Sequence, residues 1–281
     1  MRKEHLKIVC AGIWAYEGLN KMFFIQAIIT IWQREVIRYL RDKIRIISTL
    51  FQPIMFLFIF GMGLQETLAG GNFSMDFIQF MYPGIIAINV MGVAFFSTIS
   101  TVWDREFGFL KEILVAPVSR TAIVLGKVLG ATTVAVLQAL ILLIIAPFIS
   151  VNLSFIIVLK LFFSMALLAF SISCLSLLIA SLMTTMESFG LLMQVLIFPM
   201  FFLSGAFFPL KNVPLWMTVL SKINPLTYGV DAFRQIILGP QVSAEVINSV
   251  ALHSVSTNTL FLIIFSFIMV TIAVLTFDRN S

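Results

Sequence analysis

Six long apolar runs, separated by polar stretches, dominate the pattern of hydrophobic and polar positions along the chain. A helix that crosses a bilayer needs about 20 predominantly apolar residues, and it satisfies its backbone hydrogen bonds internally. Each run is long enough for that purpose. We therefore predict six transmembrane helices, at residues 46–64, 78–101, 122–149, 155–182, 189–208 and 259–277. Six spans place both termini on the same side of the membrane.

The residues before the first predicted span alternate between apolar and basic positions with a helical period. In "TIWQREVIRYLRDKIRI" (30–46), a helical wheel at about 100° per residue puts most apolar side chains on one side and four arginines on the other: Arg34, Arg38, Arg41 and Arg45. This pattern is typical of a helix that lies flat at the membrane surface, with its arginines toward headgroups and water. Such a helix either anchors the topology only or also contacts a partner. We assign residues 1–45 to this N-terminal segment and residues 46–281 to one transmembrane domain.

A polar stretch, "VWDREFGFLKEILVAPVSRTA" (102–122), separates the second and third predicted spans. Its apolar side chains share one face of a helix that Pro117 ends. The charged side chains of the segment are Asp104, Arg105, Glu106, Lys111, Glu112 and Arg120. Because its acidic members would be repelled by anionic lipid, a protein partner explains them better than lipid adhesion. An ordinary surface loop is the alternative.

Four prolines interrupt the segment between the fifth and sixth predicted spans, "SGAFFPLKNVPLWMTVLSKINPLTYGVDAFRQIILGP" (204–240). The pattern predicts two helices too short to span, near 214–223 and 226–238, with Asn224 and Pro225 at the corner between them. Asp231 and Arg234 are three residues apart, so one helical face can hold both as an ion pair. That pair either stabilises the helix or contacts a substrate.

Composition and charge fix the class of protein and its orientation. With 60% hydrophobic and 11% charged residues and a mean hydropathy of +1.07, the chain is an integral membrane protein. Nine of the 18 lysines and arginines precede residue 46, and three more lie in 102–121. Loops rich in these residues stay cytoplasmic, so we predict cytoplasmic termini. The net charge of +5 collects beside the membrane and favours anionic lipid, rather than nucleic acid, as a partner.

The sequence gives no support for ATP binding, proton coupling, metal binding or catalysis by this chain. The Gly126-Lys127 pair is followed by Val128 and lacks the upstream glycine of a phosphate-binding loop, so we predict that Lys127 extends toward lipid headgroups. The six predicted spans contain no Asp or Glu, which counts against a proton-coupled carrier but leaves open a sodium site built from carbonyls. The two histidines and two cysteines form no recognisable catalytic or metal-binding motif, and we expect no metal and no enzyme activity.

Three segments resemble the permease subunits of ABC-2 type exporters, a family that includes drug-resistance, nodulation-factor and polysaccharide exporters of prokaryotes. They are "REFGFLKEILVAPVSRTAIVLGKVLG" (105–130), "LSGAFFPL" (203–210) and "LSKINPLTYGVDAFRQIILG" (220–239). The resemblance implies an all-α membrane protein of the prokaryotic inner membrane. In it, 102–121 is a cytoplasmic coupling helix that docks on a separate ATPase, and re-entrant or outer-leaflet helices precede the last span. It also implies a homodimer with two ATPase copies, which would bind ATP and Mg²⁺, while this chain binds no cofactor.

The expected function is ATP-driven export from the cytoplasm or inner leaflet. Phenylalanine is abundant, with 29 residues against four Tyr and four Trp, and this scarcity of amphipathic rings favours a hydrophobic or amphiphilic cargo, whether drug-like, lipid or lipid-linked glycan. Small residues at 61–63 and 204–207 predict self-association through the first and fifth spans. A secondary carrier or passive pore is the alternative function, followed by a structural subunit.

Overall fold

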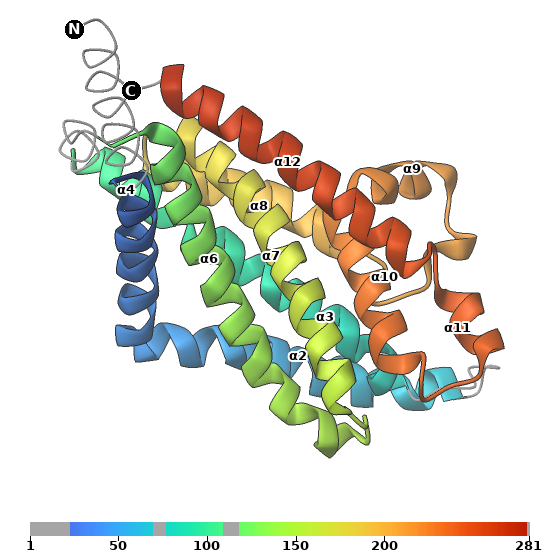
Figure 1. Ribbon diagram of the computed structural model, residues 1–281. Coiled ribbons are helices and arrows are strands. Elements are labelled where there is room, and N and C mark those ends of the chain that lie inside the picture. The colour runs from blue at the N-terminus through green and yellow to red at the C-terminus, as the bar shows by residue number, and fades with distance from the viewer. Residues whose placement is uncertain (1–22, 70–76, 109–117, 280–281) are drawn as a thin grey trace, which may run out of the picture.

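The computed structural model describes residues 23–69, 77–108 and 118–279, and within these ranges every regular element is a helix. The first, over residues 23–41, is called the N-terminal helix. Figure 1 shows the helices that follow it: α2 (Lys43–Ala69), α3 (Phe77–Ser97), α4 (Ile99–Glu106), α6 (Arg120–Leu142), α7 (Phe155–Leu182), α8 (Met186–Phe202), α9 (Leu215–Ile223), α10 (Pro225–Leu238), α11 (Ala244–Val250) and α12 (Val255–Arg279). Two 3-10 turns, Leu143–Ile149 and Leu210–Asn212, complete the described elements. The all-helical prediction is confirmed.

Five stretches within the described residues are long and apolar enough to cross a membrane: Lys43–Gly61, Phe77–Glu106, Arg120–Ile149, Phe155–Leu182 and Val255–Phe277. They correspond to the first, second, third, fourth and sixth predicted spans. The fifth predicted span falls on α8, an apolar helix of only 17 residues that ends at Phe202. The chain is therefore a multi-pass membrane protein, while the count of six spans stays a prediction.

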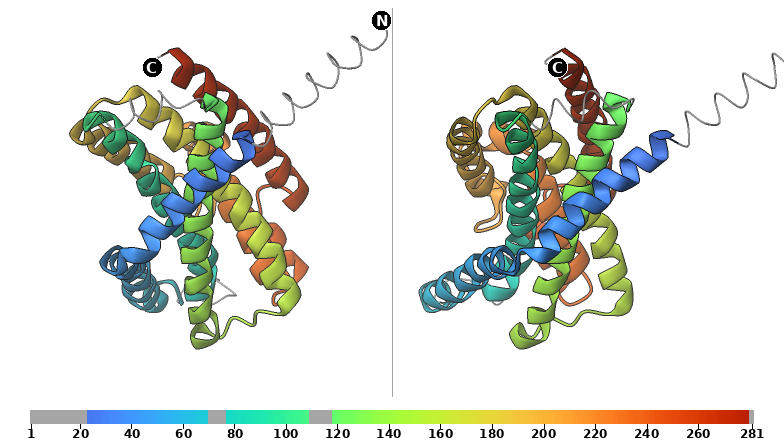
Figure 2. Two further views of the ribbon diagram at one scale, coloured as in Figure 1. Left: turned by 60° about the vertical axis from the view of Figure 1, so that its left-hand side comes forward. Right: turned by 90° about the vertical axis from the view of Figure 1, so that its left-hand side faces the viewer.

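The spans differ in how deeply they lie in the bundle. α3 and α6 lie in the interior, α7 lies beside α6, and α12 packs along α7 and α10. In the most apolar part of α2, only 11% of the residues are buried. Figure 2 shows this helix projecting from the side of the bundle. Close packing against neighbouring helices thus holds α3 and α6 in place, whereas α2 leaves most of its apolar side chains uncovered.

The N-terminal helix crosses α6, as both views in Figure 2 show. Two glycines of α6, four residues apart, allow the close approach. A Cβ atom added at Gly126 would lie 2.9 Å from the Cβ atom of Ile31, and one added at Gly130 would lie 2.7 Å from the Cβ atom of Glu35. The Trp32 indole also donates a hydrogen bond of 2.9 Å to the Thr133 hydroxyl. The N-terminal helix is therefore packed against the bundle through α6.

The small residues proposed for self-association have contacts of their own within the chain. A Cβ atom at Gly61 would lie 2.7 Å from Ile78 of α3, so this glycine permits the packing of α2 on α3. Gly205 has φ of 75° and lies in the turn after α8, where its left-handed backbone explains the glycine. A Cβ atom at Gly63 would meet nothing within 4 Å. Self-association through these segments stays a prediction.

Candidate functional site

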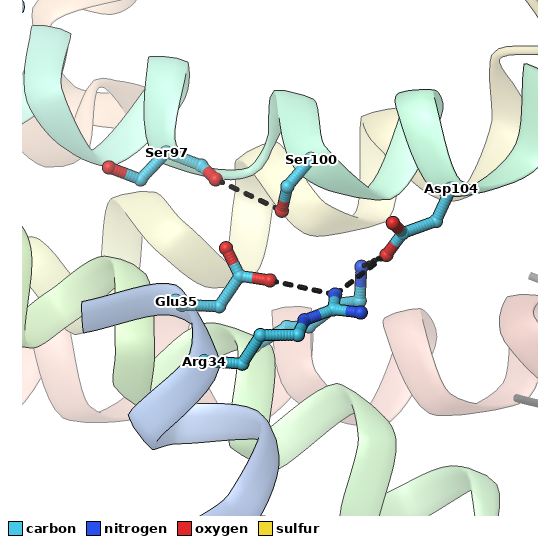
Figure 3. A network of polar contacts seen from close by, with 6 residues as sticks. Arg34, Glu35, Ser97, Ser100 and Asp104 are labelled. Atoms are coloured by element: carbon cyan, nitrogen blue, oxygen red, sulfur yellow. Dashed lines mark hydrogen bonds and ion pairs between the residues drawn. The ribbon is translucent and has the colours of Figure 1, made fainter. Parts of the chain in front are cut away.

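Four charged side chains meet where the N-terminal helix, α4 and α6 come together, and Figure 3 shows three of them. The Arg34 guanidinium donates to the Asp104 carboxylate at 2.8 Å and to the Glu35 carboxylate at 2.9 Å. From α6, the Lys127 ammonium reaches the same oxygen of Asp104 at 2.6 Å. One carboxylate on α4 thus binds cations from two other helices. We call these four residues the charge cluster.

Burial makes the balance of charge within the cluster important. Lys127 is 2% exposed and Asp104 is 7% exposed, and an isolated charge at such a position would be strongly unfavourable. Two cations face two carboxylates, so the cluster is formally neutral. Burial alone would lower the pKa of Arg34, but its hydrogen bonds and charge interactions with Asp104 and Glu35 raise that pKa above its ordinary value. The pairing therefore favours the charged form of Arg34.

Two sequence-based expectations are wrong at this cluster. Lys127 does not extend toward headgroups, because its ammonium is buried against Asp104. Arg34 does not point away from the bundle with the other arginines, because its guanidinium binds Asp104. The second predicted span ended at residue 101, whereas the apolar helical stretch continues to Glu106 and so includes Asp104. With these bounds the second span contains an acidic residue, so the argument against a proton-coupled carrier no longer applies.

The next two residues of α4 bind the junction between α7 and α8. The Arg105 guanidinium donates to the carbonyl oxygens of Ser181 and Met183 at 2.6 and 3.2 Å, at the C-terminal end of α7. The Glu106 carboxylate accepts a hydrogen bond of 2.9 Å from the backbone N–H of Met186, the first residue of α8. Each charge lies at the helix end that the helix dipole favours, a cation at carbonyls and an anion at N–H groups. α4 therefore holds both sides of this junction.

The other predicted residues of the polar segment and of the predicted interfacial helix, where the structure describes them, make contacts of their own. Arg120 donates to the Phe277 carbonyl oxygen at 3.2 Å and so binds the end of α12. Lys111 and Glu112 lie outside the described residues. The Arg38 guanidinium lies 4.7 Å from the centre of the Trp103 ring, and that of Arg45 lies 5.9 Å from the Tyr39 ring. The Arg41 side chain is exposed.

The predicted ion pair on α10 is wrong, because within the described residues its two members bind different partners. Asp231 accepts hydrogen bonds from the backbone N–H groups of Leu252 and His253 and from the Asn258 amide, at 3.1, 2.9 and 2.9 Å. Arg234 donates to the Gly205 carbonyl oxygen at 2.9 Å and lies 4.0 Å from the centre of the Phe80 ring. Asp231 thus fixes the approach to α12, and Arg234 fixes the turn after α8.

Asn224 and Pro225 form the corner between α9 and α10. The Asn224 side chain accepts a hydrogen bond of 3.0 Å from the Leu226 N–H, which caps the start of α10, and its amide donates to the Met200 carbonyl oxygen at 2.8 Å. Pro225 occupies the first turn of α10, where the missing N–H costs nothing. These contacts stabilise the region, while its position relative to the membrane stays a prediction.

Sequence reasoning missed the charge cluster, although one signal pointed to it. Lys127 lies in the third predicted span, and an ionisable residue within a span calls for a named partner. Asp104 is 23 positions earlier and, with the second span ended at residue 101, was assigned to a loop. Glu35 lies between the arginines of the amphipathic pattern, and nothing in that pattern showed that α6 would cover it.

A bundle with several helices able to cross a membrane defines the class of a polytopic membrane protein. The family model described as "ABC-2 type transporter" matches residues 26–238. The chain belongs to this family, and it is a transport permease. The matched range includes the charge cluster, the α7–α8 junction and all of α10.

Curated relatives carry names that agree with this assignment. The chain is 32% identical over 220 residues to "Putative transport permease ycf38" of Cyanophora paradoxa, which covers 77% of this chain and 76% of that protein. It is 34% identical over 169 residues to "Probable multidrug ABC transporter permease YbhR" of Escherichia coli, which covers 59% of this chain and 46% of that protein. It is also 28% identical over 222 residues to "Inner membrane transport permease YadH" of Escherichia coli, covering 76% and 83% respectively.

Proposed function

We propose that this chain is the permease subunit of an ATP-driven exporter in the cytoplasmic membrane of a prokaryote. Two copies of the chain, each with six spans that include α8, would assemble with two copies of a separate ATPase that binds ATP and Mg²⁺. The end of the bundle that contains α4, together with both termini, would face the cytoplasm. Arg41, which is exposed on the N-terminal helix, would face anionic lipid.

The observation that carries the proposal is the set of connections made by α4. Through Asp104 it binds the N-terminal helix and α6, and through Arg105 and Glu106 it binds the α7–α8 junction. A partner that moved the segment following α4 would therefore act on four other helices at once. This arrangement supports a coupling role for residues 102–121 on the ATPase side.

A cavity of about 170 Å³ between α2, α3 and α8 supports a hydrophobic or amphiphilic cargo. Its lining is mostly apolar, with Phe56, Ile85 and Phe201 among the lining residues. Binding sites for small molecules are typically concave, with apolar walls and a few polar groups. This lining favours a cargo with an apolar part, whether a drug-like molecule, a lipid or a lipid-linked glycan, of which the cavity would hold a portion.

A secondary carrier is the second candidate, because the buried pair of Asp104 and Lys127 lies within helices assigned to spans. Ionisable pairs within spans also occur in proton relays. The two functions differ in their energy source. Transport into vesicles that depends on the co-purified ATPase and stops with vanadate favours the exporter, whereas transport without the ATPase that stops with a protonophore favours the carrier.

The coupling role of α4 can be tested with a label on α8. Val195 is 75% exposed and takes a spin label in a chain whose Cys10 and Cys174 have been replaced. In the assembled complex, ATP with vanadate should change the distance between the labels of the two copies. Arg105→Ala combined with Glu106→Ala should abolish that change while the ATPase still co-purifies. Lys222→Ala, on the exposed surface of α9, is the matched control and should retain the change. An unaltered response in the α4 variant would refute the coupling role.

A further inference from the structure

Two cavities of opposite character share lining residues on α2 and α3. The first is the apolar cavity of about 170 Å³ between α2, α3 and α8. The second, of about 430 Å³, lies between the N-terminal helix, α2, α4 and α6, and four charged side chains line it: Glu35, Arg38, Asp42 and Arg45. We call it the polar vestibule. Thr49 and Phe96 line both cavities, so the two cavities are adjacent, and we call the pair the cleft, with a polar end and an apolar end.

The charges of the polar vestibule are not equally available to a ligand. Glu35 accepts a hydrogen bond of 2.9 Å from Arg34, and Asp42 accepts one of 3.0 Å from the backbone N–H of Arg45. Among the described residues, no carboxylate lies within salt-bridge distance of the guanidinium of Arg38 or Arg45. Both guanidiniums instead lie over aromatic rings. Their donors match the oxygens of a phosphate or a carboxylate, so these two arginines offer a site for an anionic group.

The cleft also contains a buried polar atom without a partner. Asn89 is 6% exposed and lines the apolar cavity, and its amide nitrogen donates to the Thr49 carbonyl oxygen at 3.0 Å. The Asn89 side-chain oxygen has no hydrogen-bond partner in the described structure. Buried acceptors are nearly always paired. A ligand in the apolar cavity that donates one O–H or N–H group would pair this oxygen.

We propose that this cleft binds the exported cargo, and that the cargo is an amphiphile with an anionic head. The head, a phosphate or a carboxylate, is held by Arg38 and Arg45. The apolar part passes Thr49 and Phe96 into the apolar cavity, where a hydroxyl or amide group donates to Asn89. The identity of the cleft as a cargo site rests on the proposed export function, and the charge of the head is the additional inference.

The head can be tested by binding to the purified full chain in a nonionic detergent, measured by native mass spectrometry. The probes are oleoyl lysophosphatidic acid, which is anionic, and oleoyl lysophosphatidylcholine, which is zwitterionic. Arg38→Gln and Arg45→Gln should each weaken binding of the anionic probe about fivefold, since one basic side chain near a lipid phosphate contributes about 1 kcal/mol. Arg41→Gln is the matched control, because it removes an exposed arginine of the same segment outside the cleft. It should leave binding unchanged.

Binding in the apolar cavity can be tested with a substitution that leaves the fold intact. Gly92 lines the apolar cavity, and a Cβ atom there would meet nothing within 4 Å. Gly92→Leu should therefore fill the cavity without strain and weaken binding of both probes at least tenfold. Gly190→Leu is the matched control, because its Cβ atom would also meet nothing within 4 Å and it lies outside this cavity. Equal unfolding midpoints for both variants would show that the fold is retained.

The results separate this inference from the proposed function. Binding of the anionic probe that is insensitive to Arg38→Gln, Arg45→Gln and Gly92→Leu would overturn the cleft as the site, even if the complex exports in an ATP-dependent manner. Equal affinity of the wild-type chain for the two probes would overturn the anionic head. Charge-selective binding at the cleft without ATP-dependent transport would instead leave the site standing and overturn the exporter.

Discussion

Replacing Asp104 by Asn should destabilise the protein because it removes the anion that two cations share. Lys127 would then remain buried at 2% exposure with its nearest carboxylate neutralised. Removing one partner of a buried ion pair typically costs about 3 to 5 kcal/mol. Glu35 contributes a second, weaker attraction to Lys127, which places the expected loss at the lower end, about 3 kcal/mol.

Two further variants separate the contributions within the charge cluster. Arg34 is 35% exposed on its side chain, so solvent screens its pair with Asp104, and Arg34→Gln should cost only about 1 kcal/mol. Adding Lys127→Met to Asp104→Asn removes the uncompensated cation and replaces it with an apolar side chain of similar length. The double variant should therefore come within about 1 kcal/mol of the wild-type chain, as replacement of buried pairs by apolar residues is often nearly neutral.

Reversible unfolding by sodium dodecyl sulfate in mixed micelles, followed by tryptophan fluorescence, would measure these free energies of unfolding. Together with Lys127→Met alone, the wild-type chain, Asp104→Asn and the double variant form a double-mutant cycle. The coupling between Asp104 and Lys127 is the loss of the double variant minus the sum of the two single losses. The reasoning is refuted if Asp104→Asn is no more destabilising than Arg34→Gln. It is also refuted if Lys127→Met fails to restore the stability of the Asp104→Asn variant.

Three other predictions concern the packing of the N-terminal helix, the α7–α8 junction and α10. Gly130→Leu should lower the free energy of unfolding by about 1 to 3 kcal/mol, because the larger side chain overpacks against the N-terminal helix. The control Gly190→Ala should not lower it, because the added Cβ atom meets nothing within 4 Å and alanine favours helix. Equal losses for the two variants would contradict the contact at Gly130. Arg105→Ala should speed hydrogen exchange of amides near Met183, and unchanged exchange there would show that its two bonds do not hold the junction. Asp231→Ala should cost at least about 2 kcal/mol in unfolding free energy, because it leaves three donors without their acceptor, and a neutral effect would argue against that role.

The elements of the fold follow from features that act over short distances along the chain. Apolar run length alone predicts the five membrane-crossing stretches, on α2, α3 with α4, α6 with the turn after it, α7 and α12, to within about five residues at each end, because a bilayer requires a helix of fixed length with internal hydrogen bonds. The length of α8 is less predictable. Its apolar run continues to residue 208, but the backbone turns after Phe202, where Gly205 adopts a left-handed conformation.

The contacts of the charged residues could not be predicted in this way, because they depend on which helices become neighbours. Spacing on α10 predicts that Asp231 and Arg234 are close, yet each is surrounded by backbone groups from other segments that it binds instead. Likewise, the reason for glycine at positions 126 and 130 is visible only once the N-terminal helix is seen to pack on them. Without that helix against α6, Lys127 would have no reason to be buried beside Asp104.

The three consecutive charged residues of α4 each have partners that depend on the tertiary structure. Successive residues on a helix point in directions about 100° apart, so Asp104, Arg105 and Glu106 cannot all face the same neighbour. Asp104 points to the N-terminal helix and α6, while Arg105 and Glu106 reach the two sides of the α7–α8 junction. A rotation of α4 about its own axis would therefore strain contacts on several sides together, whereas a small shift of any one neighbour would strain only its own. This asymmetry supports the proposed coupling role of α4, in which motion from a partner would spread through it into the bundle.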